Sequence, residues 1–385
     1  MRILHVVPTY LPAVRYGGPI FAVYGLCKAL VARGNHVEVF TTNVDGSSNS
    51  DVPLGTPVRL DGVLIRYFRC PFLRRIYYAP ALRRALEREL ESFDIVHLHS
   101  VFLWPTWVAA RAARNSGIPY VISPRGMLVK DLIARRSRFI KSAWIKLIEK
   151  TNLEHAAAIH LTSGVELTEL ERFGWKLSRC AVIPNGIYEP GRQGGLVGAD
   201  IKQATMHRPF ALFLGRLGWK KGLDRLLRAF AQTRLGILVI AGTDDEKFAP
   251  RLVKLARDLK ITDRILILPR TVVEREKTEL YASARVFVLP SYSENFGNTV
   301  LEAMQHGLPV VVTPEVGAAE IVRRSGGGLV VEGDSHALGA AIGSLMDDDR
   351  RARMMGDAGR RHVAKHYDWA SVAVRMESFY STLVR

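Results

Sequence analysis

Cysteine is scarce in this chain: its 385 residues include only three, Cys27, Cys70 and Cys180, which are far apart in the sequence. Three scattered thiols exclude a disulfide framework and a cysteine-based metal site, and they are typical of a reducing compartment. Long apolar runs are also absent, since none approaches the roughly 18 residues that a membrane span requires. The opening MRILHVVPTYLPAV is too polar for a signal peptide and fits a first strand better. We therefore expect a soluble, cytoplasmic protein.

Acidic residues are the second deficit. The chain has 37 Asp and Glu against 54 Lys and Arg, a net charge of +17. Residues 1–188 have 25 basic against 14 acidic side chains, a net of +11, and the remainder has a net of +6. Such an excess favours anionic partners: nucleic acid, acidic lipid or a phosphorylated substrate. Because no DNA- or RNA-binding motif is present, we expect no nucleic-acid partner.

Short apolar runs of β type alternate with segments of helical period along the whole chain. The expected strands cover residues 2–7, 36–41, 95–99, 120–123, 158–162, 181–184, 210–214, 236–241, 265–268, 286–289, 309–312 and 328–331. Buried Val, Ile and Leu runs between helices predict parallel sheets covered on both faces, an α/β fold. The length of the chain suggests two such domains.

A Gly-rich, non-periodic segment marks the domain boundary. It predicts an N-terminal Rossmann-like domain over 1–188, a linker over 189–209 and a C-terminal Rossmann-like domain over 210–365. Residues 366–385 are expected to form a C-terminal helix that packs back on the N-terminal domain. The two doubly wound domains would face a central cleft, because such sheets bind ligands at the carboxyl ends of their strands.

The segment 212-LFLGRLGWKKGLDRLLRAF-230 is typical of a strand, a Gly-rich turn and a helix. Its cations are Arg216, Lys220 and Lys221. Together with the N–H groups of a helix start, they predict a phosphate site. The alternative is an ordinary βα turn with solvated cations.

The segment 290-PSYSENFGNTVLEAMQHGLPVVVT-313 contains two glutamates, Glu294 in a predicted turn and Glu302 in a predicted helix over 299–306. Eight residues at helical rise span about 12 Å, roughly the length of a nucleoside diphosphate with its sugar. Each carboxylate would accept hydrogen bonds from hydroxyls at one end of such a ligand. The N–H groups of residues 296–299 would face its phosphates. The alternative is that Glu294 caps the helix and Glu302 is solvated.

The pattern Glu-Asn-Phe-Gly-Asn-Thr-Val-Leu-Glu-Ala-Met, with Gly-Arg-Leu-x-x-x-Lys-Gly upstream of it, closely resembles glycosyltransferase family 4, retaining enzymes of the GT-B fold. The resemblance extends over nearly the whole chain. It includes the segments 5-HVVPTYLPAVRYGGP-19, 94-DIVHLHS-100, 181-AVIPNGI-187 and 315-EVGAAEIV-322.

The resemblance implies that the N-terminal domain binds the acceptor and that the C-terminal domain binds the nucleotide sugar. It also implies a role for each matching residue. Glu302 would hold the donor ribose, Glu294 the hydroxyls of the transferred sugar, and Arg216 and Lys221 the diphosphate. The further donor-binding residues implied are Gly17, Gly18, Lys220, Arg270, Thr271, Val272, Asn295, Phe296, Gly297, Asn298 and Thr299. Residues 270–272 would border the nucleobase. Arg270 follows Pro269 where many members have a glycine, so UDP and GDP both remain open.

His97 and His99 lie in one predicted strand. We predict that His97 is a packed core residue and that His99 points to the other side of the sheet. The family's histidine in this strand contacts the transferred sugar, so His99 joins Glu294, Arg216 and Lys221 as a predicted catalytic residue. Gly17 and Gly18 form either a plain tight turn or, by resemblance, a contact with donor phosphate and acceptor.

No metal and no other cofactor are expected. Residues 244–246, Asp-Asp-Glu, invite a magnesium site, but no partner ligand is evident and we interpret them as a solvated loop. The resemblance implies that cationic side chains and helix N-termini stabilise the leaving diphosphate instead of a metal. The nucleotide sugar is a substrate.

Residues 127–152 combine an apolar stripe with many cations, and residues 74–88 mix arginine with tyrosine. A core-facing stripe with a solvated back would explain the apolar residues but not the shortage of acids. Basic amphipathic helices suit anionic membrane surfaces. The predicted membrane-contacting residues are Arg135, Arg136, Arg138, Lys141 and Trp144.

These observations predict a retaining hexosyltransferase that moves sugar from a UDP- or GDP-sugar to a saccharide or lipid-linked saccharide in surface polysaccharide biosynthesis. It would act in the cytoplasm, peripherally on the inner face of the cytoplasmic membrane. Two alternatives remain: a sugar-nucleotide epimerase, which shares the GT-B architecture, and a non-catalytic nucleotide-sugar or membrane-binding module. Product analysis without acceptor and donor-hydrolysis assays would discriminate among them.

Overall fold

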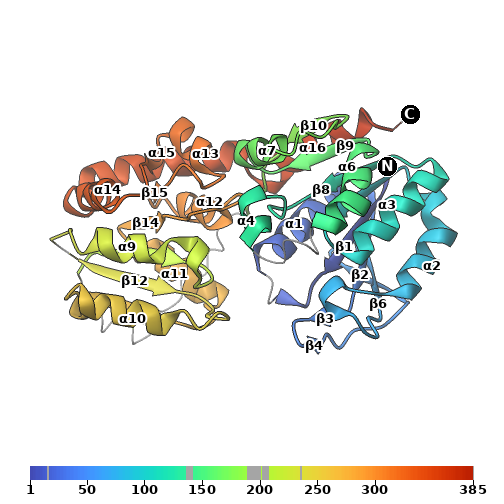
Figure 1. The fold of residues 1–385 in the computed structure, drawn as a ribbon. Helices are drawn as coiled ribbons and strands as arrows, with labels where there is room; N and C mark the ends of the chain where they lie inside the picture. Colours follow the sequence, from blue (N-terminus) through green and yellow to red (C-terminus); the bar gives the residue numbers. More distant parts are fainter. Residues whose placement is uncertain (15–16, 136–141, 189–200, 202–207, 235, 385) are drawn as a thin grey trace. The chain divides into compact units, whose positions relative to one another are not determined.

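A computed structural model describes residues 1–14, 17–135, 142–188, 201, 208–234 and 236–384 (Figure 1). These residues form two compact units. Unit 1 comprises Met1–Gly186 and Trp369–Arg385, and unit 2 comprises Ile187–Asp368. The unit boundaries differ by a few residues from those expected at 188 and 365. Most of the expected linker, 189–209, lies outside the described residues.

Unit 1 is built on an eight-stranded sheet in the order β10-β9-β8-β7-β1-β2-β6-β5. The bounds are β1 (Arg2–Thr9), β2 (His36–Thr42), β5 (Pro57–Leu60), β6 (Val63–Phe68), β7 (Ile95–His99), β8 (Tyr120–Ser123), β9 (Ala158–Leu161) and β10 (Cys180–Val182). Neighbouring strands are parallel except for the edge pair β5–β6, which is antiparallel. This edge pair departs from the expected all-parallel sheet. Two short strands, β3 (Val44–Asp45) and β4 (Ser48–Asn49), pair separately.

Helices cover both faces of this sheet (Figure 1). They are α1 (Gly18–Ala32), α2 (Pro80–Glu89), α3 (Trp104–Ser116), α4 (Lys130–Arg135), α6 (Lys150–Glu154), α7 (Gly164–Glu171) and α16 (Trp369–Ser381), with short turns η2 (Arg74–Ile76) and η3 (Leu90–Ser92) and a π-helix η4 (Ile145–Glu149). Successive strand residues point to opposite faces. Leu4 and Val6 of β1 therefore join the core under α2 and α3, whereas Ile3 and Val7 join the core under α1 and α16.

Unit 2 contains one all-parallel sheet of six strands in the order β13-β12-β11-β14-β15-β16. The strands are β11 (Phe210–Leu214), β12 (Ile237–Ala241), β13 (Ile265–Leu268), β14 (Val286–Leu289), β15 (Val310–Val312) and β16 (Gly328–Val330). The helices are α9 (Leu223–Phe230), α10 (Ala249–Asp258), α11 (Glu274–Ser283), α12 (Asn298–Gln305), α13 (Ala319–Ser325), α14 (Ser335–Asp347) and α15 (Asp349–His366), with short turns η5 (Trp219–Lys221) and η6 (Thr262–Arg264). Every residue of β11, β12, β14 and β15 is buried, as their Val, Ile, Leu and Phe runs predict.

Each sheet has one position where the strand order reverses. In unit 2 the chain runs outward from β11 through β12 to β13 and then returns to β14, which pairs with β11. In unit 1 it runs outward from β1 and returns to β7, which pairs with β1. Open α/β sheets bind ligands beyond the carboxyl ends of the strands at such positions. The loops after β11, β14, β1 and β7 are therefore where functional side chains are expected.

Candidate active site

The loops that follow β11 and β14 are held together at the switch point of unit 2. Gly222, with a φ of 64°, ends the turn after β11, and a Cβ there would lie 2.0 Å from the carbonyl oxygen of Pro290. Only glycine permits this approach, because it combines a positive φ with the missing side chain. Beside it, the N–H of Tyr292 donates to the carbonyl of Lys220 at 2.8 Å. The basic turn and the first glutamate loop therefore form one structure.

Lys221 and Glu294, 73 residues apart in sequence, meet in this structure. The ammonium group of Lys221 donates to a carboxylate oxygen of Glu294, and both side chains are mostly covered. The backbone of Glu294 is fixed as well: its N–H donates to the carbonyl of Glu315 at 3.1 Å, and its carbonyl accepts from Gly317 at 2.9 Å. A cation and a carboxylate thus lie side by side at the carboxyl end of β14.

Glu302 lies on α12 and has two partners from α11. The hydroxyl of Tyr281 donates to its carboxylate at 3.0 Å, and the ammonium group of Lys277 lies 3.4 Å away. Burial lowers the pKa of Lys277, but the charges of Glu302 and Glu274 outweigh burial and raise it. Burial and the Glu302 charge both raise the pKa of Tyr281. Glu302 is therefore held in one place, with the rest of its hydrogen-bonding capacity available to a ligand.

The segment between the two glutamates starts α12. Gly297 precedes the helix with a φ of 91°, and Asn298 and Thr299 are its first residues. Phe296 is buried in the core of unit 2, and its carbonyl accepts from Ala318 at 2.7 Å. Asn295 is half-buried between Glu294 and Phe296. The positive end of a helix dipole lies at its first turn, so this end of α12 suits an anion.

Arg216 follows β11 and residues 270–272 follow β13, two strands that β12 separates in the sheet. Arg216 is half-exposed, and its Nε lies 3.8 Å from the carboxylate of Asp245. Arg270 makes a bidentate ion pair with Glu276 at 2.6 and 2.7 Å. Thr271 is exposed, and Val272 packs against the core.

The expected solvated loop at residues 244–246 is exposed at Asp245 and Glu246, but Asp244 is half-buried and bonded. The carboxylate of Asp244 accepts the N–H groups of Phe248 and Ala249 at 2.5 and 3.0 Å. Asp244 therefore holds the start of α10, while Asp245 faces Arg216.

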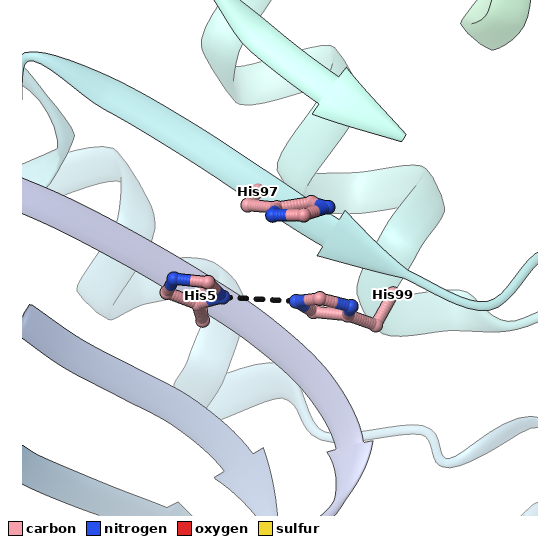
Figure 2. A group of neighbouring side chains, drawn as sticks. All are labelled: His5, His97 and His99. Atoms are coloured by element: carbon pink, nitrogen blue, oxygen red, sulfur yellow. Dashed lines mark hydrogen bonds between the residues drawn. The ribbon is translucent and has the colours of Figure 1, made fainter. Parts of the chain in front are cut away.

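In unit 1, Gly17 lies in the loop after β1 and His99 lies at the end of β7, the two strands at the switch point. Gly17, with a φ of 67°, precedes α1, and Gly18 is the first residue of that helix. His99 is the last residue of β7 and is 1% exposed. Figure 2 shows that His97 and His99 lie on the same side of the sheet as His5, with the rings of His97 and His99 4.2 Å apart. The prediction that they face opposite sides is wrong, because residues two apart in a strand share a face.

The hydrogen atoms of His99 and His5 can be assigned from their partners. Nδ1 of His99 lies 3.3 Å from Arg125 Nη2, and arginine only donates. A neutral His99 therefore has its hydrogen on Nε2 and donates to Nδ1 of His5 at 2.9 Å. The hydrogen of His5 is then on Nε2, which is buried without a partner among the described residues. Burial, then the charge of Arg125, lowers the pKa of His5 to about 3.

A second chain of hydrogen bonds fixes His97. Nε2 of His160 lies 2.8 Å from the carbonyl of Ile183, which only accepts, so Nδ1 of a neutral His160 accepts from Ser123 at 2.7 Å. Ser123 in turn accepts from Nε2 of His97 at 2.8 Å, and Nδ1 of His97 accepts the hydroxyl of Tyr380 at 2.5 Å. Burial lowers the pKa of His160 to about 3, so this neutral arrangement holds at neutral pH.

The histidine cluster, defined as His5, His97 and His99, has its nitrogens close enough to ligate a metal ion. Each neutral imidazole offers one lone pair. In this structure Arg125, His99 and Tyr380 occupy all three lone pairs by hydrogen bonding. The nearby guanidinium also opposes a further cation. The cluster is therefore better suited to hold a protein cation in place than to bind a metal.

The sequence analysis assigned no role to several residues of the site. Lys277 and Tyr281 precede Glu302 by more than twenty residues, and His5, Arg125 and Asn185 reach the neighbourhood of His99 from three separate segments. Only the sheet order brings them together. A short sequence motif does not predict such a contact.

Most of the expected membrane-contacting residues cannot be placed. Arg136, Arg138 and Lys141 lie outside the described residues, and of Arg135 only the backbone, the last residue of α4, is described. Trp144 is half-buried and donates its indole N–H to the carboxylate of Glu149 at 2.8 Å. No helix in the described part of the chain is long and apolar enough to cross a bilayer.

Comparison with known proteins identifies the class of this protein. A family model described as "Glycosyl transferase 4-like domain" matches residues 17–186, and one described as "Glycosyl transferases group 1" matches residues 200–362. A D-inositol 3-phosphate glycosyltransferase of Acidothermus cellulolyticus is 29% identical, with 96% of this chain and 87% of that protein covered. The enzyme of the same name from Xylanimonas cellulosilytica is 27% identical, with 95% and 91% covered.

Solved structures agree with this class. The sucrose-phosphate synthase of Thermosynechococcus elongatus has a TM-score of 0.74 at 23% identity, with 100% of this chain and 99% of that one covered. The Anabaena protein HepE, in complex with UDP and glucose, has a TM-score of 0.76 at 17% identity, with 99% and 100% covered. At this identity the likeness shows the fold, which is GT-B. The chain belongs to the GT-B glycosyltransferases of the group 1, family 4 type, and takes its sugar from a nucleotide-sugar donor.

Proposed function

We propose that this protein is a retaining hexosyltransferase that takes its sugar from UDP- or GDP-hexose. The observation that carries the proposal is the arrangement at the switch point of unit 2. Glu302 is held by Lys277 and Tyr281, Glu294 is held beside Lys221, and the start of α12 lies between the two glutamates. A nucleotide sugar has hydroxyl groups at both ends, on the ribose and on the sugar, with a diphosphate between them. Two fixed carboxylates on either side of an anion-binding helix start match this order of groups.

The chemistry that this arrangement supports is stabilisation of the leaving diphosphate. Negative charge grows on the diphosphate as the glycosidic bond breaks, so fixed cations such as Lys221 and Arg216 lower the barrier. Lys221 would exchange part of its contact with Glu294 for the diphosphate, which leaves Glu294 to accept hydrogen bonds from the sugar. No carboxylate of these motifs is proposed as a covalent nucleophile. The departing phosphate would deprotonate the acceptor hydroxyl on the same face, and no metal is required.

The donor assignment is tested by incubating the protein with UDP-, GDP- and ADP-glucose and their galactose and mannose counterparts. We expect release of one nucleoside diphosphate, from hydrolysis or transfer, well above the rate of the Lys221→Ala variant. An unchanged rate in that variant, for the donor that is consumed, would contradict the site. If the nucleotide sugar is consumed and its epimer is the only product, the result favours an epimerase.

Two acceptor classes remain. The first is a lipid-linked saccharide of a surface polysaccharide, which the basic charge of unit 1 supports. The second is a soluble, phosphate-bearing acceptor, because the curated relatives are named for D-inositol 3-phosphate. The position of Arg125 in unit 1 is compatible with either, since both carry phosphate.

We also propose that unit 1 contacts the inner face of the cytoplasmic membrane. The three most exposed large apolar side chains among its described residues are Leu147, 77%, and Phe72 and Leu73, each 57%. Leu147 therefore does not belong to a core-facing stripe. Residues 62–86 contain six arginines and no acidic residue. Apolar side chains beside arginines are typical of a surface that binds acidic lipid.

The loop of residues 69–75 presents its apolar pair in a defined conformation. Leu73 has a φ of 51°, which a branched side chain adopts only when its surroundings impose it. Arg74 supplies that constraint by donating to Asn49 at 2.5 Å, to the carbonyl of Gly46 at 3.2 Å and to the carbonyl of Ser48. The ring of Phe72 lies 4.9 Å from that of Tyr78. The exposure of Phe72 and Leu73 is thus built into the fold.

Replacing Phe72 and Leu73 together by Ser should weaken binding to phosphatidylglycerol vesicles about 30-fold. The change removes on the order of 2 kcal/mol of apolar burial at the lipid surface. Co-sedimentation at low salt measures it, and Met354→Ser, an equally exposed apolar position in unit 2, is the control. Wild-type protein should stay in solution with phosphatidylcholine vesicles or at high salt. Failure of the wild type to sediment with phosphatidylglycerol would contradict membrane contact without touching the transferase assignment.

A further inference from the structure

Arg125 is a half-buried cation that the donor site does not use. It follows β8 after Pro124, with a φ of 55°, and Gly126 follows with a φ of 72°. Two successive residues in the left-handed region turn the chain sharply at the carboxyl end of β8. β8 pairs with β7, the strand that ends at His99. The guanidinium group is therefore placed beside the switch point of unit 1 by the backbone itself.

The partners of this guanidinium are all neutral. Nη1 donates to the side-chain oxygen of Asn185 at 2.9 Å, and Nη2 donates to Nδ1 of His99 at 3.3 Å. Nε is buried and has no partner within the described part of the chain. Arginine remains charged in proteins, so the site holds a positive charge that neutral groups orient but do not neutralise.

Glu166 is the carboxylate whose charge acts on Arg125, and it is hydrogen-bonded to other groups. One of its carboxylate oxygens accepts the N–H of Gly126 at 2.7 Å, and the other accepts the N–H and hydroxyl of Thr162 at 2.8 and 3.1 Å. It makes no ion pair with Arg125 among the residues that the structure describes. Glu166 therefore fixes the turn and acts on the charge of Arg125 only at a distance. The guanidinium group of Arg125 keeps N–H donors that no described residue uses.

The surrounding histidines add donors and no acceptors. The hydrogen-bond directions leave the lone pairs of His5, His97 and His99 occupied and the N–H of His5 at Nε2 unpartnered. A site with a partly unpaired cation, an unused N–H and no free lone pair is complementary to an anion. Burying such a charge without a counter-charge is costly, which a bound anion would relieve.

We propose that Arg125, oriented by Asn185 and His99, binds the phosphate group of the acceptor in unit 1. The inference rests on the proposed function in one respect, the assignment of unit 1 to the acceptor. Phosphate fits better than a neutral saccharide because Arg125 retains three N–H donors beyond its two bonds, and phosphate can accept several of them. Two sources share this chemistry: a soluble sugar phosphate, and the diphosphate of a lipid-linked saccharide.

The test is calorimetric titration of the full chain with three anions and one neutral control. The probes are inorganic phosphate, inositol 3-phosphate, a short-chain polyprenyl diphosphate glucose and uncharged myo-inositol. The proteins are wild type, Arg125→Gln, Arg125→Lys and, as the matched control, Arg111→Gln, which removes an exposed arginine of the same unit. Each variant is also titrated with the nucleoside diphosphate that the wild type releases, which reports whether unit 2 is folded.

We expect at least one phosphate-bearing probe to bind tenfold or more tightly than myo-inositol. The preference should fall to within about twofold in Arg125→Gln, persist in part in Arg125→Lys and remain intact in Arg111→Gln. Preference for inositol 3-phosphate identifies a soluble acceptor, and preference for the polyprenyl probe a lipid-linked one. No phosphate preference in the wild type, or a preference that survives in Arg125→Gln, overturns the proposal. If the wild type does not bind any nucleoside diphosphate, the proposed function is contradicted instead.

Discussion

Lys221→Ala is expected to lower kcat by about 10² to 10³ at saturating donor, the loss typical when one charge-stabilising donor is removed from a transition state. Two effects add in this variant. The diphosphate loses a cation whose contact strengthens as charge develops, and Glu294 loses the ammonium group that balances it. An unbalanced carboxylate beside the leaving diphosphate raises the barrier further. Arg216→Ala should cost less, because Arg216 is half-exposed and faces Asp245.

The control for this prediction is Lys254→Ala, which removes an exposed lysine on α10 of the same unit. Glu302→Ala serves as the contrast. Because Glu302 is assigned to the ribose, its loss should weaken the binding of the nucleoside diphosphate and should lower kcat less than the loss of Lys221 does. Steady-state kinetics with the donor identified by the hydrolysis panel measure both. A Lys221→Ala variant that turns over at the wild-type rate would remove Lys221 from the chemistry.

Unit 1 is expected to lose stability steeply as the pH falls below about 6.5, at least about 3 kcal/mol between pH 6.5 and 5. The cause is the buried histidines. Burial lowers the pKa of His5 and of His160 from 6.5 to about 3, and it lowers those of His97 and His99 as well. In this window the unfolded chain binds protons that the folded chain does not. Stability is therefore full above pH 6.5 and declines as the pH falls toward 3.

The size follows from linkage, since each pH unit contributes about 1.4 kcal/mol for each histidine kept neutral by folding. Against a typical total of about 5–15 kcal/mol, a loss of this size is a large share of the stability. Urea unfolding at a series of pH values measures it, with His160→Gln expected to show a shallower pH slope and His155→Gln, at an exposed position, an unchanged one. A flat stability profile from pH 7 to 5 would contradict the neutral hydrogen-bonded histidine network.

Much of the fold could be predicted because the central strands are nearly pure Val, Ile, Leu and Phe. The runs at β11, β12 and β14 give an unambiguous buried-strand signal. The edge pair β5–β6 could not be predicted, since β5 is mostly exposed and its Pro and Arg obscure any alternation. Edge strands need only one hydrogen-bonded neighbour, and their sequence is correspondingly less constrained.

The motifs of the candidate site could be predicted from the sequence, but the side-chain contacts between distant segments could not. The glutamates and the basic turn are local patterns, so their positions at the ends of β14 and β11 follow from the strand assignments. The contact between Lys221 and Glu294, and those of Glu302 with Lys277 and Tyr281, depend on the strand order, which one sequence does not specify. The histidine cluster depends on side-chain direction within strands. The strand that contains His97 and His99 was predicted correctly, but the faces of the sheet to which their side chains point were not.

The measurement that tests the central claim most directly is proton NMR of the sugar released or transferred from an α-linked nucleotide hexose, recorded within the first minutes of reaction. The coupling constant of the anomeric proton distinguishes the two anomers before mutarotation mixes them. The account predicts that the first product is the α anomer, and that it forms at a rate which Lys221→Ala reduces about 10²-fold or more. A first product in the β configuration, or none from any nucleotide hexose, would contradict it.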